Sequence, residues 1–293
     1  MQNIKSLIRS LILVSGVSIA ACTERIDIDV NDAPPQLVIY GAITTDTKQH
    51  EITVRRSSNY FSNTAPEGIS GAIVTISDGD ETLVLTESPS EKGVYLTAPD
   101  VFGVEGKTYT LNVTVEFNGA TDEYEATSFL PYSIRVDSVA LQQSHLSSNI
   151  VEALLYGQLP ESSRGENFFD PVYLNIVAYK NNNIPLNDQL SDYNIIVSEN
   201  VISRDINGAV CMYIHSGYDE DRAYIEKGDI VTFQVRSITK EYADYVKDVQ
   251  SELRGSIPIF SGPPANIPTN IRARNASNTT PVCGFFTAYS KTQ

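Results

Sequence analysis

The feature that most constrains the fold is the alternation of apolar and polar residues along most of the chain after Pro35. In residues 108–117 apolar side chains alternate with threonine, asparagine and glutamate. The apolar positions are Tyr109, Leu111, Val113, Val115 and Phe117. A period of two places every second side chain on one side of a strand, so the pattern predicts β-strands with one buried face.

The same alternation predicts strands in both halves of the chain, separated by turns rich in glycine and aspartate. The expected strands are 37–42, 51–55, 72–77, 82–86, 94–98, 109–117, 134–141, 151–156, 172–179, 194–198, 209–214, 230–237 and 282–290. Short strands at this spacing favour antiparallel sandwiches. We therefore predict a mainly β protein with two β-sandwich domains, the first of immunoglobulin-like size.

The first sandwich is expected to span residues 37–131, because a proline at 131 interrupts the pattern. The second β-rich domain would span 132–293 and carries longer loops, where binding residues tend to lie. Within it, apolar residues recur at helical spacing over 239–254, which predicts one amphipathic helix. Four prolines follow in 256–270 and favour an extended, proline-rich strap.

The N-terminus has the layout of a bacterial lipoprotein signal peptide. Residues 1–21 combine Lys5 and Arg9 with a short apolar run, and small residues precede Cys22. We expect removal of 1–21 and attachment of a diacylglycerol and palmitate anchor to Cys22, with 22–36 as a tether. The alternative is a soluble secreted protein in which Cys22 is incidental.

The chain is acidic, with a formal net charge of -15, and loss of Lys5 and Arg9 with the signal peptide would make it about -17. This balance argues against nucleic acid as a partner, since phosphate-binding surfaces need clustered lysine and arginine. Four acidic residues follow Cys22, at Glu24, Asp27, Asp29 and Asp32. They form either a solvated linker or a signal for display on the cell surface.

Two cysteines remain after Cys22, namely Cys211 and Cys283. In an oxidising compartment they could form a disulfide, which makes the pair a disulfide candidate. Both lie in apolar, strand-like sequence, so two buried free thiols are the alternative. Neither has a second cysteine or a histidine at zinc-ligand spacing, which argues against a zinc site.

The sequence carries no familiar catalytic motif. Its three histidines lie outside any HExxH pattern, and no G-x-S-x-G, P-loop or G-x-G-x-x-G occurs. We expect no enzymatic activity, no cofactor and no resident metal. The acidic clusters at 78–81 and 219–221 lack the ligand pattern of a calcium loop, so a tight turn and a solvated loop are the simpler interpretations.

Aromatic and proline residues in polar loops are the better candidates for contact with a ligand or partner. These candidates are Tyr60, Phe61, Phe168, Phe169, Pro263 and Pro264. Exposed rings between polar residues often mark recognition sites, whereas rings on loops can also pack beneath their own domain.

Several segments in order resemble a known family. They are CTERIDIDV, QLVIYGAIT, ISGAIVTISDG, KGVYLTAPDVFGVEGKTYTLNV, IRVDSV, SITKEYADYVKDVQ, PPANIPTNI and VCGFFTAYS. Together they resemble the Bacteroidota outer-membrane lipoproteins of domain of unknown function 4249. The first part is also similar to transthyretin-like sandwiches, so the resemblance implies an immunoglobulin/transthyretin-like first domain. The family defines no catalytic residues.

The resemblance implies a partner. Members of this family are typically encoded beside TonB-dependent outer-membrane receptors, so we expect an accessory lipoprotein at the cell surface that cooperates with such a receptor in nutrient capture. Its cargo could be a small molecule, a peptide or a glycan. The alternatives are a structural or adhesive surface lipoprotein without cargo and, third, a lipoprotein enzyme.

Overall fold

The computed structural model describes residues 35–292 except 59–64, 161–170, 182–183, 187–193, 198–203, 218–223, 254–266 and 275–280. Residues 35–293 cluster as one compact unit. The described part is mainly β-strand with one helix, as the alternation predicted.

The first half is a β-sandwich. One sheet contains β1 (Leu37–Thr44), β2 (Glu51–Arg56), β3 (Glu67–Gly68), β6 (Thr86–Glu87) and β7 (Val94–Leu96). The facing sheet contains β4 (Ile73–Ser77), β5 (Thr82–Val84), β8 (Thr108–Phe117), β9 (Ala120–Phe129) and the short β18 (Arg272–Ala273). The alternating residues of β1, β4 and β8 meet between the sheets, and Ile39, Ile76 and Leu111 are buried there.

The second half is also built from two sheets. One runs in the order β10 (Arg135–Gln143), β11 (Ile150–Gln158), β15 (Asp205–Ser216) and β16 (Tyr224–Ile225). The other contains β12 (Tyr173–Lys180), β13 (Ile184–Pro185), β14 (Asn194–Val197) and β17 (Val231–Ile238). A second core includes Leu155, Ile176, Met212 and Val235.

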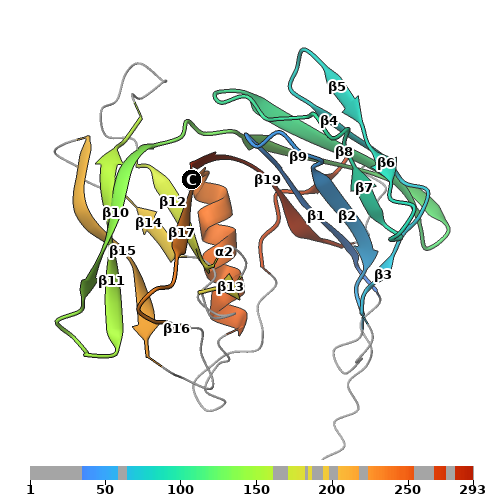
Figure 1. Ribbon diagram of the computed structural model, residues 1–293. Helices are drawn as coiled ribbons and strands as arrows, with labels where there is room; N and C mark the ends of the chain where they lie inside the picture. Colours follow the sequence, from blue (N-terminus) through green and yellow to red (C-terminus); the bar gives the residue numbers. More distant parts are fainter. Residues whose placement is uncertain are drawn as a thin grey trace, which may run out of the picture. The chain divides into compact units, whose positions relative to one another are not determined.

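The last strand, β19 (Val282–Thr292), belongs to both halves (Figure 1). Leu37–Thr44 pairs with it in parallel, and its end at Ser290–Thr292 pairs antiparallel with β17. The sheet is therefore continuous in the order β13-β12-β17-β19-β1-β2-β7-β6. The sequence pattern predicts 282–290 as part of the second domain, whereas the structure places Phe286 and Ala288 of this strand in the core of the first sandwich.

Asn270 fixes the side of β19 that faces β9. Its Nδ2 donates to the carbonyl oxygens of Thr127 (3.2 Å) and Phe286 (2.7 Å), and its Oδ1 accepts from the backbone N–H of Phe286 at 3.0 Å. Ser128 Oγ accepts from the N–H of Ala288 at 2.9 Å. On this edge of β19 no strand in the described part of the chain pairs with Phe286 or Ala288. The side chains of Asn270 and Ser128 therefore satisfy the buried backbone groups of these two residues.

The predicted helix at 239–254 is confirmed as α2 (Lys240–Leu253). Thr239 caps its start, because its hydroxyl accepts from the N–H of Tyr242 at 3.2 Å. The apolar face of α2 packs on the sheet face opposite the first core. This third cluster contains Tyr173, Ile238, Tyr242, Ala243, Val246 and Phe285. The helix therefore covers the sheet where β12, β17 and β19 meet.

Candidate functional site

All six residues singled out as contact candidates lie outside the described part of the chain. This holds for Tyr60, Phe61, Phe168, Phe169, Pro263 and Pro264, for the anchor residue Cys22, and for the acidic cluster at 219–221. Their roles remain predictions.

The disulfide candidate is corrected by the structure. Cys211 and Cys283 are both free thiols. Cys211 is buried in the core of the second sandwich, where burial raises its pKa to about 11. Cys283 lies on β19 beside the first sandwich, and its Sγ donates to Gln36 Oε1 at 2.7 Å. The two cysteines therefore belong to different packing environments, and the alternative of two buried free thiols holds in part, since both thiols are free but only Cys211 is buried and Cys283 is half-buried.

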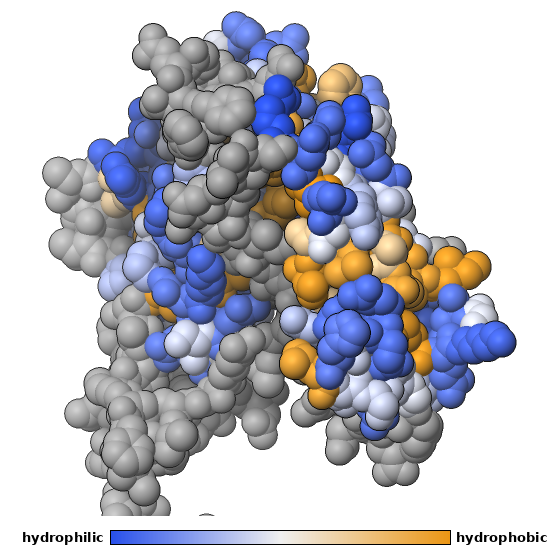
Figure 2. Space-filling view, turned by 90° about the vertical axis from the view of Figure 1, so that its left-hand side faces the viewer, coloured by the Kyte–Doolittle hydropathy of each residue, from blue (hydrophilic) through white to orange (hydrophobic). Residues whose placement is uncertain are grey.

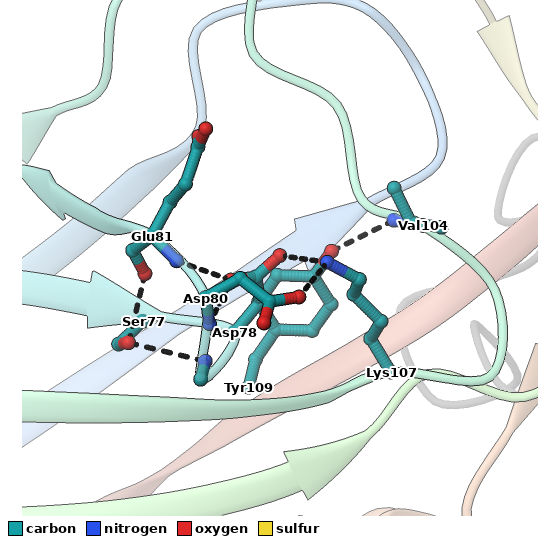
Figure 3. Close-up of polar contacts among 8 residues, drawn as sticks. Ser77, Asp78, Asp80, Glu81, Val104, Lys107 and Tyr109 are labelled. Atoms are coloured by element: carbon teal, nitrogen blue, oxygen red, sulfur yellow. Dashed lines mark hydrogen bonds and ion pairs between the residues drawn. The ribbon is translucent and has the colours of Figure 1, made fainter.

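The acidic turn at 78–81 is closed by a lysine of its own sandwich (Figure 3). The ammonium of Lys107 lies 2.6 Å from Asp78 Oδ2 and 3.0 Å from Asp80 Oδ2. Asp78 Oδ1 also accepts from the backbone N–H groups of Asp80 and Glu81. The Lys107 ammonium, followed by these backbone donors, lowers the pKa of Asp78 to about 2. This cluster is therefore a hairpin turn that its own hydrogen bonds and the Lys107 ammonium stabilise, and Lys107 supplies the positive charge that a bound cation would otherwise supply.

The outer face of the β10–β11–β15 sheet exposes apolar side chains. Leu154 of β11 points away from the core, between Ala140 of β10 and Val210 of β15 in the register. Val210 is 41% exposed and Tyr213, in the next row, is 56% exposed. Figure 2 views the side on which these strands lie and shows hydrophobic residues gathered beside hydrophilic ones. A contiguous exposed apolar patch on a sheet face is typical of an interaction surface.

One carboxylate is held firmly within this face. Glu152, opposite Tyr213 in the register, is 8% exposed and accepts from Gln142 Nε2 at 3.0 Å and from Ser144 Oγ at 2.7 Å. These two hydrogen bonds hold the pKa of Glu152 below its ordinary value. The face therefore combines exposed apolar area with a fixed negative charge. Its border, β10, is the edge strand of this sheet.

A second arrangement lies on the outer face of the long sheet, next to α2. Asn175 of β12, Arg236 of β17 and Lys291 of β19 are neighbours in the register and form a polar row. Arg236 donates through Nε to Gln234 Oε1 at 2.9 Å and through Nη1 to Asn175 Oδ1 at 3.3 Å. Its guanidinium lies 5.4 Å from the ring centroid of Tyr289. Neither partner is a carboxylate.

The polar row extends to Asp46 and Lys48, which follow β1 in the chain. Lys291 Nζ lies 2.6 Å from Asp46 Oδ2, and Lys48 Nζ lies 3.9 Å from the same oxygen. One carboxylate thus serves two lysines beside an arginine. Burial, and then repulsion by Lys291 and Arg236 against the attraction of Asp46, lowers the pKa of Lys48. The neighbourhood carries excess positive charge in an acidic protein.

His50 is a structural residue in the first sandwich. It is 1% exposed, and its Nε2 is 3.1 Å from the carbonyl oxygen of Val101. Burial, reinforced by Lys48, lowers the pKa of His50. The neutral form therefore links β2 to the 98–107 loop.

The part of the chain that the structure describes contains no group of three or more His, Cys, Asp or Glu residues able to hold a metal ion. Within the same residues no helix has both the length and the apolar character needed to cross a membrane. Neither the apolar face nor the polar row was found from the sequence. Each depends on which strands are neighbours, which the alternation does not reveal.

The chain matches the family described as domain of unknown function DUF4249 over residues 23–293. The chain belongs to this family. The predicted resemblance is thereby confirmed at the level of the family, over the whole of the chain after Cys22. No curated protein matches this DUF4249 chain.

Proposed function

We propose that this DUF4249 protein is a lipid-anchored outer-membrane lipoprotein, facing the cell exterior, that cooperates with a TonB-dependent receptor in nutrient capture. Membrane attachment is supported by the signal-peptide layout and by Cys22 after its small residues. The receptor as partner comes from the family resemblance described above.

The observation that carries the contact surface is the outer face of the β10–β11–β15 sheet. Leu154, Val210 and Tyr213 present apolar area around the fixed carboxylate of Glu152. Interfaces combine a central apolar or aromatic patch with polar groups that set orientation. A tethered protein meets its membrane partner at millimolar effective concentration, so one sheet face is sufficient for a modest intrinsic affinity.

The protein would act by binding rather than by chemistry. Asp78 and Asp80 are engaged by Lys107, and His50 is buried and bonded to a backbone carbonyl. The carboxylate of Glu152 is ionised and serves as a hydrogen-bond acceptor. The one hydroxyl among these contacts is that of Ser144, which donates to Glu152 and is itself buried.

The test is affinity purification of the tagged, lipidated protein from detergent-solubilised outer membranes, followed by mass spectrometry. We expect stoichiometric recovery of a TonB-dependent receptor. Val210→Asp should reduce that recovery at least about tenfold by placing a charge in the apolar centre. Val84→Asp is the matched control, because Val84 is 70% exposed on the first sandwich.

Two outcomes count against the proposal in different ways. Recovery of the wild-type protein without a receptor would favour a structural or adhesive surface lipoprotein. Equal receptor recovery with Val210→Asp and Val84→Asp would retain the partner but refute the β10–β11–β15 face as its contact. Protease treatment of intact cells tests the orientation, and full protection would contradict surface display.

A further inference from the structure

We propose that Arg236 and Asn175 form a binding site for a carboxylate group, on the face of the β12–β17–β19 sheet that borders α2. The site is separate from the β10–β11–β15 face and does not depend on the proposed receptor. Among the residues that the structure describes, its elements are an arginine without a counter-ion, a buried amide donor without an acceptor and a local excess of positive charge.

The first element is the guanidinium of Arg236. Its contacts are Gln234, Asn175 and the ring of Tyr289, and no carboxylate in the described part of the chain lies within ion-pair distance. Arginine carries its charge at every pH that the protein meets. With Nε and Nη1 engaged, the N–H groups of Nη2 remain available to an incoming anion.

The second element is the side-chain amide of Asn175. The residue is 1% exposed, and its Nδ2 has no hydrogen-bond partner within the described part of the chain. The orientation of the amide follows from Arg236, because the group that meets the Nη1 donor at 3.3 Å must be the oxygen. A buried donor without an acceptor is costly, and such a group in a native fold calls for an explanation.

The third element is the surrounding charge. Arg236, Lys291 and Lys48 lie close enough for the first two to depress the pKa of the third, whereas Asp46 is the one acidic group that raises it. Lys291 and Lys48 share this one carboxylate, so these four described groups carry two more positive than negative charges, and Arg236 is the cation that has no acidic partner among them. An anion that enters the row would reduce this repulsion.

The donor set favours a carboxylate over other anions. A carboxylate presents two oxygens in one plane, and the arginine and amide donors come from adjacent strands at one register position. The ring of Tyr289 lies against the guanidinium and limits its rotation. The apolar cluster of α2 begins directly beside the row, with Tyr173 and Ile238. A small organic acid or the end of a peptide would satisfy this arrangement.

The test uses the full chain in detergent micelles, with acetate as the probe. Saturation-transfer NMR should show transfer to the acetate methyl group. At tenfold excess over its dissociation constant, sodium acetate should raise the Tm by about 3 °C relative to sodium chloride of equal ionic strength. Asn175→Asp should abolish both effects, because its own carboxylate meets Arg236.

Asn112→Asp is the matched control, since Asn112 Oδ1 accepts from Arg274 at 3.4 Å on the first sandwich. It should leave the acetate signal unchanged. Equal Tm shifts with acetate and chloride in the wild type would overturn the proposal, as would acetate transfer that persists in Asn175→Asp. Displacement of the bound acetate by an equal concentration of sulfate in the saturation-transfer experiment would overturn the assignment to carboxylates.

A second probe distinguishes the two sources of a carboxylate. N-acetylglycine carries the group at the end of a peptide unit. If it displaces acetate, the site accepts a peptide C-terminus. If acetate binds and N-acetylglycine does not displace it, the site accepts small free acids. Because no receptor is present, failure of this experiment leaves the proposed function untouched.

Discussion

Replacing Gly284 with alanine should destabilise the pairing of β19, the strand shared by the two sandwiches, with β1. Gly284 lies on β19 with a φ of 100°, opposite Ile39 of β1. A Cβ at this position would overlap the carbonyl oxygen of Ile39 and lie 2.8 Å from its carbonyl carbon. These are backbone atoms of a paired strand, so no side-chain rotation relieves the overlap.

The cost can be separated into two parts. An alanine in the left-handed region costs about 1–2 kcal/mol by itself. To relieve the overlap, β19 must move by about 1 Å from β1, which breaks the neighbouring ladder hydrogen bonds, each contributing about 1 kcal/mol net. Two or three lost bonds bring the expected destabilisation to about 4 kcal/mol. At about 2–4 °C per kcal/mol, the Tm should fall by roughly 12 °C.

Gly119→Ala isolates the overlap from the backbone strain. Gly119 has a φ of 82° and no atom within 4 Å of an added Cβ, so it should lose about 1–2 kcal/mol only. Thermal unfolding of both full-length variants by circular dichroism gives the comparison. A Gly284→Ala variant with the Tm of Gly119→Ala would refute the close approach of β19 to β1.

Three further predictions concern single contacts. Asn270→Ala removes three hydrogen bonds and leaves backbone groups of β19 unpaired, so it should lower the Tm by roughly 9 °C, measured by thermal unfolding. The pKa of Asp78 is lowered from 3.8 to about 2. Its contribution to stability is therefore present above pH 4 and is lost as the pH falls towards 2. Because Lys107 is the main cause of this shift, Lys107→Met should flatten that part of an acid-unfolding curve. Iodoacetamide at pH 8 should spare buried Cys211 in the native chain, and denaturation without reductant should expose both Cys211 and Cys283 to alkylation.

Each of these predictions has an outcome that would contradict it. Asn149→Ala, at an exposed loop position, should change the Tm by about 1 °C or less, and an equal effect of Asn270→Ala would argue against its bracing role. Lys227→Met is the exposed control for the acid-unfolding curve, and equal acid-unfolding curves for Lys107→Met and Lys227→Met would contradict the role of Lys107. Failure to alkylate either thiol without reductant would show that the disulfide forms after all.

The sequence was sufficient to predict those strands and the helix whose pattern of buried residues repeats within the element itself. Alternation predicted strands that the structure contains, such as 109–117 within β8, and helical spacing predicted α2 within one residue at each end. Both patterns arise because one face of the element is buried and the other is not. No partner strand needs to be known for this inference.

The strand β9 was missed because its buried positions are not apolar enough. Its inward residues are Asp122, Tyr124, Ala126 and Ser128. The signal that would have found it is the Asn118-Gly119 pair, since both residues adopt positive φ (50° and 82°) between β8 and β9. Asn-Gly between two strands is a strong hairpin signal, and it outweighs the weak alternation that follows.

The apolar face of the β10–β11–β15 sheet and the polar row could not be predicted from the sequence for a different reason. An asparagine that alternates with core residues is expected to face solvent. Asn175 is buried instead, because both faces of its strand are covered. Its neighbour in the row, Arg236, is 61 residues away along the chain. Local periodicity specifies the face on which a side chain lies and says nothing of the strand beside it.

The position of the polar row ties the carboxylate site to the folding of the whole chain. Arg236 and Lys291 are neighbours only through the last three residues of β19, and β19 is held by β1 at the other end of the sequence. Its placement is fixed further by Asn270, which bonds to both β9 and β19. A variant that loosens the first sandwich, such as Gly284→Ala, should therefore weaken acetate binding at Arg236 although it alters no residue of the second sandwich. Undiminished acetate binding in that variant would show that β17 and β12 position the row without β19.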